Sequence, residues 1–120
     1  MKPGFRCTQR EARKYLDDIA HAAELITRFT AGKNFGDFAS DAMLRAAVER
    51  EFEIIGEAIA RLARIDEPLA ARISDRRRIV AFRNILIHGY ADVDHRVAWS
   101  VVETDLPILR REIDALIRIA

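Results

Sequence analysis

Apolar residues recur every three or four positions along almost the whole chain, and this spacing limits the chain to a helical fold. Between residues 12 and 29 the stripe comprises Ala12, Leu16, Ile19, Ala22, Ala23, Ile26 and Phe29, and between residues 40 and 64 it comprises Leu44, Val48, Phe52, Ile55, Ile59 and Leu62. This period places apolar side chains along one face of an α-helix. Only five Gly and three Pro occur among 120 residues, so few residues interrupt helices. We predict an all-α fold.

Caps and turn residues divide the first half of the chain into two predicted helices. Thr8-Gln9-Arg10-Glu11 fits a capping box that opens the first helix, and Gly32 closes it before a loop over residues 33–37. The second helix covers about residues 40–64 and contains Gly56 near its centre. A Gly in a helix interior costs about 1 kcal/mol relative to Ala, so we expect Gly56 to mark the close approach of another helix.

The second half holds a short turn and two further predicted helices. The turn runs from Pro68 to about Ile73, the third helix covers residues 76–87 and ends at Gly89, and the fourth runs to the C-terminus with a kink or break at Pro107. The expected helix caps are Ser74 or Asp75, then Asp92 or Asp94, and Thr104 or Asp105 beside the proline.

These segments predict an up-and-down bundle of four to five helices, as a single domain over residues 1–120. The apolar positions outnumber those that a slim bundle can hide. Ala47, Ile54 and Ala58 lie beside the main stripe of the second helix. We therefore expect a homodimer that buries the excess.

Charge is balanced overall but not locally. The net charge is +1, whereas residues 72–83 carry five Arg and one acidic residue, Asp75. Such a patch attracts polyanions, including RNA. Its candidate RNA-binding residues are Arg76, Arg77 and Arg78, with an ordinary solvated helix face as the alternative.

The expected location is the cytoplasm, without a membrane partner. Cys7 is the single cysteine, which excludes an internal disulfide and fits a reducing compartment. The first residues lack the apolar stretch of a signal peptide, and no apolar run approaches the roughly 20 residues of a membrane span.

Arg83 and His88 are the candidate catalytic residues. They lie five positions apart, which is about 140° around an ideal helix. We expect them to converge only if the helix end unwinds at Gly89 or if they meet across a dimer seam. The residues between them, Ile85, Leu86 and Ile87, are expected to anchor the turn in the core. On spacing alone, two cations that satisfy the last carbonyls of the helix remain an open alternative.

Arginine and histidine in one cleft form a minimal set for cutting RNA without a metal. Histidine exchanges protons near neutral pH, and the planar fork of arginine matches phosphate oxygens. Asn84 is a supporting residue that orients a partner or the phosphate, and Tyr90 lines the same cleft. Asp92, Asp94 and His95 with His88 make a metal site conceivable, but no ligand spacing supports it, so we expect no metal or cofactor. His21 is expected at the surface.

The segment from Arg83 to Tyr90 reads Arg-x4-His-x-Tyr and resembles the motif of HepT-like proteins, a branch of the HEPN superfamily of helical ribonucleases. The similarity extends from about Leu16 to Pro107, through Leu16-Asp17-Asp18-Ile19, Phe29-Thr30-Ala31-Gly32, Phe38 with Asp41, Ala47-Val48-Glu49-Arg50, Glu53-Ile54-Ile55-Gly56-Glu57-Ala58, Phe82 and Asp105-Leu106-Pro107.

The resemblance implies the toxin of a two-gene toxin–antitoxin system. It implies a homodimer whose clefts bring together Arg83 and His88 of both chains, and a metal-independent endoribonuclease of the type that leaves a 2′,3′-cyclic phosphate. The implied partner is a small nucleotidyltransferase antitoxin of the minimal MNT type, which transfers AMP from ATP to Tyr90. A structured RNA such as tRNA is the implied substrate.

Two positions depart from the family pattern. Relatives often carry a Pro-Trp pair shortly before the motif, where this chain has Ser74-Asp75-Arg76-Arg77-Arg78, and residue 91 is Ala where a larger residue is common. Two other hypotheses stay open: a helical subunit that binds RNA or a nucleotide for a nucleotidyltransferase without cutting, and a purely structural dimerisation bundle. Toxicity on expression without the neighbouring gene would exclude the structural bundle.

Overall fold

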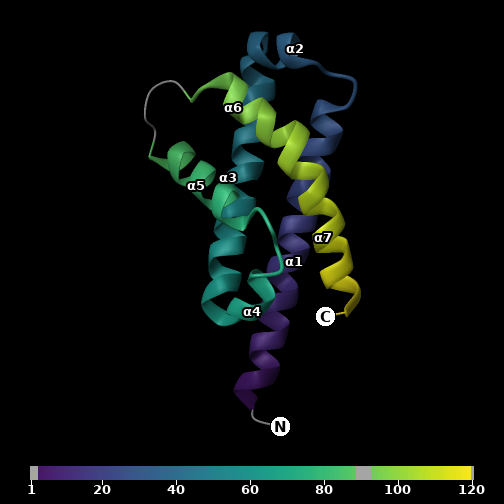
Figure 1. Ribbon diagram of the computed structural model, residues 1–120, viewed down its shortest axis with the longest axis vertical. Helices are drawn as coiled ribbons and strands as arrows, with labels where there is room; N and C mark the ends of the chain where they lie inside the picture. Colours follow the sequence, from purple (N-terminus) through teal and green to yellow (C-terminus); the bar gives the residue numbers. More distant parts are fainter. Residues whose placement is uncertain (1–2, 89–92, 120) are drawn as a thin grey trace.

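Helices that run alternately up and down the molecule make up its described structure (Figure 1). The computed structural model describes the backbone of residues 3–88 and 93–119, and the side chains of residues 8–88 and 93–119. Its elements are α1 (Pro3–Thr30), α2 (Phe35–Ser40), α3 (Ala42–Ile65), α4 (Glu67–Ala70), α5 (Arg76–Ile87), α6 (His95–Ser100), the π-helix η1 (Val101–Asp105) and α7 (Leu106–Ile119). The predicted all-α up-and-down bundle is confirmed.

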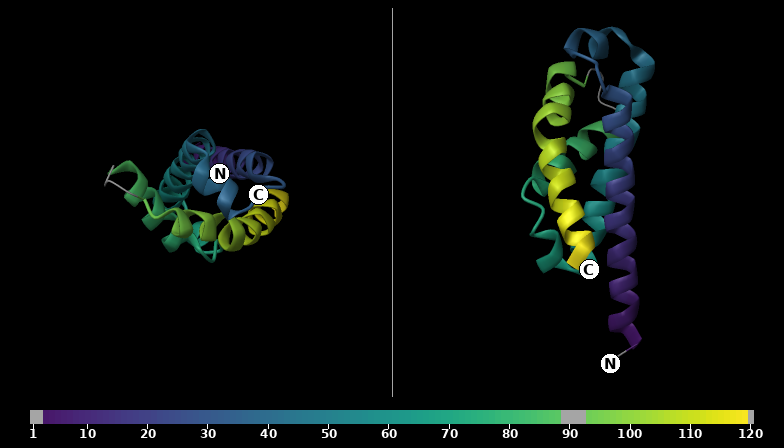
Figure 2. Two further views of the ribbon diagram at one scale, coloured as in Figure 1. Left: turned by 90° about the horizontal axis from the view of Figure 1, so that it is seen from above. Right: turned by 90° about the vertical axis from the view of Figure 1, so that its right-hand side faces the viewer.

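The core lies where the predicted apolar stripes face one another. α1 packs along α3, α7 packs on α1, and α5 packs on α3 (Figures 1 and 2). Phe52 of α3 and Phe82 of α5 meet edge to face with ring centroids 5.5 Å apart, an arrangement that aromatic rings favour. Among the described helices, none carries an apolar stretch long enough to cross a membrane.

The start of α1 differs from the prediction. α1 begins at Pro3, so Thr8 lies within the helix and the proposed capping box does not open it. Proline suits a first helical turn because its φ is already helical and it has no N–H to leave unpaired. The end is as predicted: Gly32, with a φ of +72°, follows the last turn.

The short helix α2 begins within the segment 33–37 that was predicted as a loop, and it extends to Ser40. Asn34 and Asp37 form a reciprocal capping box, in which the Asp37 N–H donates to Asn34 Oδ1 over 2.9 Å and the Asn34 N–H donates to Asp37 Oδ2 over 3.0 Å. This box was readable in the sequence. It places Phe38 in the core, where its ring lies 5.2 Å from that of Trp99.

The cap expected for α5 is absent. Asp75 occupies the N-cap position but its side chain accepts no capping hydrogen bond. The Ser74 hydroxyl donates instead to Glu112 of α7 over 2.8 Å. The residues before α5 therefore tie it to the C-terminal helix rather than cap it.

Pro107 neither breaks the last helix nor creates a new cap. The helical backbone passes from α6 through η1 into α7, and the Leu106 N–H donates to the carbonyl of Val101, five residues back. A π-turn is one way in which a helix accommodates an irregularity. Asp105, predicted as a possible cap, is buried, and its Oδ2 lies 3.1 Å from Nε of Arg78 on α5.

Candidate active site

The side chain of Arg83, on α5, packs against α3 at Gly56. A Cβ added to Gly56 would stand 2.4 Å from Cβ and 2.7 Å from Cγ of Arg83, closer than real atoms approach. Only glycine leaves room for the stem of this arginine. The predicted close approach at Gly56 is therefore confirmed, and the neighbour that requires it is the candidate catalytic arginine. The Arg83 side chain is 13% exposed.

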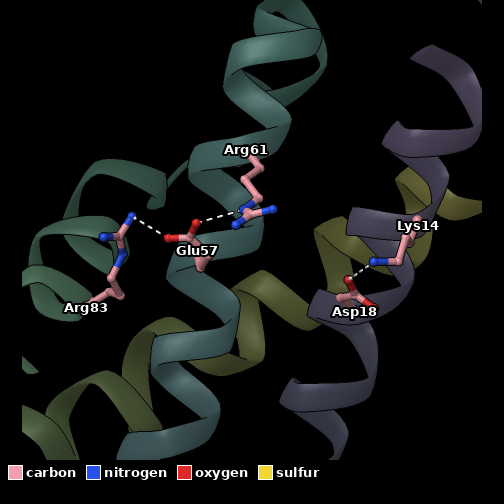
Figure 3. A network of polar contacts seen from close by, with 5 residues as sticks. All are labelled: Lys14, Asp18, Glu57, Arg61 and Arg83. Carbon is pink, nitrogen blue, oxygen red and sulfur yellow. Dashed lines mark hydrogen bonds and ion pairs between the residues drawn. The ribbon is translucent and has the colours of Figure 1, made fainter. Parts of the chain in front are cut away.

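Glu57 bridges two arginines beside this crossing (Figure 3). Its Oε2 lies 3.2 Å from Nη2 of Arg83, and its Oε1 accepts a 2.8 Å hydrogen bond from Nε of Arg61. The hydrogen bond from Arg61 holds the pKa of Glu57 below its ordinary value, and the charge on Arg83 lowers it further. Glu57 is therefore a stable anion between two cations.

The guanidinium of Arg83 is held from one side. Its Nε is buried and has no hydrogen-bond partner among the described residues, and the same nitrogen lies on the side that faces Gly56. The ion pair with Glu57 is made through Nη2, on that same edge. These contacts do not involve the N–H groups of Nη1.

His88 stands at the exposed end of α5. It is the C-cap residue, with φ −77° and ψ −6°, and its N–H donates to the carbonyl of Asn84 over 3.2 Å. The backbone is thus still helical at His88. An ideal helix places the Cα–Cβ bonds of Arg83 and His88 about 140° apart around its axis, so the two side chains leave α5 in different directions.

Two of the three apolar residues between Arg83 and His88 do not anchor the turn in the core. Leu86 is buried, but Ile85 is 47% exposed and Ile87 is 50% exposed. α5 packs chiefly on α3, and its buried residues are Ile79, Phe82 and Leu86. The predicted location of excess apolar surface on α3 is also wrong in part, because Ala58 is buried. The exposed apolar residues of this region lie on α5, beside the motif.

The three candidate RNA-binding arginines differ in their surroundings. Arg76 pairs with Glu67 of α4 through Nη2, and Arg78 pairs with the buried Asp105 and donates to the Ser100 hydroxyl over 3.2 Å. Arg77 is exposed, and no ion pair joins it to another described residue. Of these three arginines, Arg77 is therefore the one that is exposed and makes no ion pair with another described residue.

A groove of about 320 Å³ runs between α3 and α5 beside the candidate site. Apolar and polar side chains both line it: Ile59, Ala60, Ala63, Arg76, Arg77, Val80, Ala81 and Asn84. Asn84, the predicted supporting residue, is exposed and lines this groove, and it follows Arg83 in the chain. The arrangement connects the motif to the basic patch.

The remaining candidates fall in three groups. Tyr90 and Asp92 lie outside the described residues. Asp94 caps α6 through a 2.8 Å hydrogen bond from the Arg96 N–H, and His95 lies edge to face with Phe38. Within the part of the chain that the structure describes, no three His, Cys, Asp or Glu side chains gather as a metal site would require. His21 is exposed on α1, as expected.

Glu57 is the site residue that sequence reasoning did not single out. It belongs to the segment Glu53-Ile54-Ile55-Gly56-Glu57-Ala58 that resembles the family, but acidic residues on an exposed helix face are common, and spacing alone did not tie it to Arg83. The signal was the adjacent Gly56, which marked where a second helix crosses.

The described fold is an all-helical bundle in which α5 ends with an arginine and a histidine, side chains that can bind phosphate and exchange protons. The family model described as "Ribonuclease HepT-like" matches residues 19–116. The chain belongs to this family of HEPN ribonucleases.

Individual relatives agree with this assignment. The chain is 40% identical over 108 residues to the protein named "Probable ribonuclease HepT" of Thermococcus cleftensis, which covers 90% of this chain and 97% of that one. It is 33% identical over 107 residues to "Putative RNase MJ1380" of Methanocaldococcus jannaschii, covering 89% and 97%. It is 29% identical over 106 residues to "Putative RNase TTE0752" of Caldanaerobacter subterraneus, covering 88% and 94%. No solved structure matches the chain.

Proposed function

We propose that this ribonuclease is the toxin of a two-gene toxin–antitoxin pair, and that it cuts RNA without a metal at a cleft between two copies of the chain. Family membership supports RNA as the substrate. The positions of Arg83 and His88 on α5 support the cleft. The products are an RNA with a 2′,3′-cyclic phosphate and an RNA with a free 5′-hydroxyl.

The observation that carries the dimer cleft is the regular helix from Arg83 through His88. Because α5 stays helical to His88, the two side chains of one chain face about 140° apart. In the proposed dimer, Arg83 of one copy meets His88 of the other. The exposed Ile85 and Ile87 give α5 an apolar surface beside the motif, which pairing with a second copy would bury.

The proposed chemistry is an in-line transfer within the RNA. One His88 takes the proton from the ribose 2′-hydroxyl, and the 2′-oxygen bonds to phosphorus as the bond to the 5′-oxygen breaks. The His88 of the other copy, in its protonated form, gives a proton to the leaving 5′-oxygen. Arg83 stabilises the negative charge that builds on the phosphate oxygens.

We propose that a nucleotidyltransferase antitoxin of the minimal MNT type switches the enzyme off. It transfers AMP from ATP to the Tyr90 hydroxyl, and pyrophosphate leaves. The added phosphate repels the RNA backbone and the adenosine blocks the cleft. The support for Tyr90 as the acceptor is its place in the sequence, two residues after His88.

The first experiment is RNA cleavage in the presence of a chelator. Purified protein is mixed with labelled tRNA or with an unstructured RNA, and the 3′ ends of the products are analysed by mass spectrometry. We expect cleavage to persist in EDTA and to disappear in His88→Ala and Arg83→Ala. His21→Ala is the matched control, an exposed histidine on α1, and should cleave like the wild type.

Intact RNA with folded wild-type protein would overturn the proposal and favour a non-catalytic subunit that binds RNA or a nucleotide. The switch is tested separately by incubation with ATP and the nucleotidyltransferase. A mass gain of AMP is expected in the wild type and in Tyr15→Phe, but not in Tyr90→Phe. Modification that persists in Tyr90→Phe would refute Tyr90 as the acceptor.

A further inference from the structure

We infer that Glu57 is a positioning residue for catalysis, because it fixes the edge that Arg83 presents to the phosphate. The kinetic part of this inference rests on the proposed function. Its structural part concerns only the Arg83 guanidinium and is testable without RNA.

Two consecutive residues of α3 hold the side chain of Arg83. Gly56 lets the Arg83 stem lie directly on the helix, since any Cβ there would overlap it at 2.4 Å. Glu57 then meets the end of the same side chain, with 3.2 Å between Oε2 and Nη2. The stem and the end are thus both fixed by α3, and the guanidinium has little freedom to rotate.

Glu57 is itself held in place. Arg61, one turn further along α3, donates to the other carboxylate oxygen over 2.8 Å. Figure 3 shows the carboxylate reaching from α3 toward Arg83 on one side and Arg61 on the other. A carboxylate that is ionised and bound at both oxygens holds an arginine in one orientation better than a mobile carboxylate does.

The charges give this role a distinctive signature. Arg61, Glu57 and Arg83 together carry two positive charges and one negative charge, so the bridge remains a net cation. Removing the negative charge of Glu57 leaves more positive charge near the RNA, and RNA binding should not weaken. It also frees the guanidinium, so the stabilisation of the transition state should weaken. A misplacement of about 1 Å can cost on the order of a hundredfold in rate.

Glu57→Gln therefore has an expected kinetic pattern. We expect kcat to fall by about tenfold to a hundredfold, with KM for RNA unchanged or lower. Glu57→Asp keeps the carboxylate and should recover part of kcat. The matched control is Glu53→Gln, one turn earlier on α3, where the carboxylate pairs with Arg50 over 3.3 Å and does not reach α5. This control should keep wild-type kcat and KM.

The structural arm follows the Nε–Hε signal of Arg83 in ¹⁵N NMR spectra. Because this nitrogen is buried, we expect a protected signal in the wild type and in Glu53→Gln. In Glu57→Gln the signal should broaden or exchange faster with water, while circular dichroism shows an intact fold. Arg83→Lys identifies the signal by its disappearance.

Each outcome separates the inference from the proposed function. An Arg83 signal that stays protected in Glu57→Gln overturns the positioning role, whether or not the protein cuts RNA. A raised KM with unchanged kcat also overturns it, because Glu57 would then act in RNA binding. Absence of cleavage by the wild type, with an Arg83 signal that depends on Glu57, refutes the proposed function and leaves the positioning of Arg83 supported.

Discussion

The Cβ of Arg83 lies 2.4 Å from the point where a Cβ on Gly56 would stand. In an ordinary helix interior, Gly→Ala stabilises by up to about 1 kcal/mol. Here the new methyl group would overlap the Cβ and Cγ of Arg83. These atoms are fixed by the backbone of a packed helix, so they cannot move aside as the end of a flexible side chain can. We predict that Gly56→Ala lowers the free energy of unfolding by about 1–3 kcal/mol, measured by urea denaturation, and that it lowers RNA cleavage.

A double-mutant cycle isolates this contact. Arg83→Gly removes the opposing Cβ, so Gly56→Ala should cost much less in an Arg83→Gly background than in the wild type. Equal costs in both backgrounds would show that the two residues do not interact and that the loss arises elsewhere.

The long helices could be predicted from the sequence because each follows a regular apolar period. The stripe of Leu44, Val48 and Phe52 fixes the buried face of α3 without reference to any partner. The beginning of α1 and the path of the chain through Pro107 could not be predicted in this way. A capping box and a proline each permit several local structures, and packing decides between them.

The candidate site was predictable only in part for the same reason. Arg83 and His88 could be picked out by their residue types and their spacing. Gly56 could be picked out because a glycine within a helix lowers its stability. The contact between Glu57 and Arg83 joins residues 26 positions apart, and it depends on how α5 crosses α3. Ile85 and Ile87 are likewise exposed because few elements pack on α5. The local sequence pattern of α5 does not show how many elements will pack on it.

Asp105 provides a test of stability against pH. Burial raises the pKa of Asp105 above its ordinary value, and the nearby Arg78 opposes this rise. The folded protein therefore binds the proton more tightly than the unfolded chain. The stability that this group contributes is present below the ordinary pKa of Asp and is lost as pH rises through the raised pKa.

We predict that Asp105→Asn becomes more stable relative to the wild type as pH rises through that window. The amide keeps an oxygen for Arg78 but carries no buried charge. Chemical denaturation of both proteins across the acid range measures the difference. Arg78→Gln is the complementary variant and should lose most stability near neutral pH, where the carboxylate is charged. A difference that does not change with pH would contradict the prediction.

The arginine patch yields a ranking of RNA contacts. Arg76 and Arg78 already face Glu67 and Asp105, whereas Arg77 has no such ion pair among the described residues. We predict that Arg77→Ala weakens RNA binding more than Arg76→Ala does, and reduces the slope of log K against log[salt] by about 1.

Fluorescence anisotropy with a 2′-O-methyl RNA, which lacks the attacking hydroxyl, measures this binding without cleavage. Arg13→Ala on α1, where the arginine pairs with Asp17, is the control for general charge loss. Equal effects of the Arg77 and Arg13 substitutions would show that the patch does not contact RNA.

The exposed isoleucines of α5 test whether two copies are needed. Ile87 is 50% exposed one residue before His88, so Ile87→Glu should leave the monomer folded while placing a charge in the proposed cleft. Burying an unpaired charge at an interface is strongly unfavourable. We therefore predict that Ile87→Glu shifts the protein from dimer to monomer in light scattering and lowers cleavage per chain by at least tenfold.

Ile119→Glu is the matched control, because Ile119 is also an exposed isoleucine, 64% exposed, but lies at the end of α7. It should remain dimeric and active. A complementation test sharpens the result: Arg83→Ala and His88→Ala are each inactive alone. A mixture of the two variants should stay far below wild-type activity, because each heterodimer holds a single intact His88 and the proposed chemistry uses one His88 as base and the other as acid. Wild-type activity in the mixture would show that one His88 is enough. A fully active monomer of Ile87→Glu would show that Arg83 and His88 of a single chain act together, and would contradict the proposed dimer cleft.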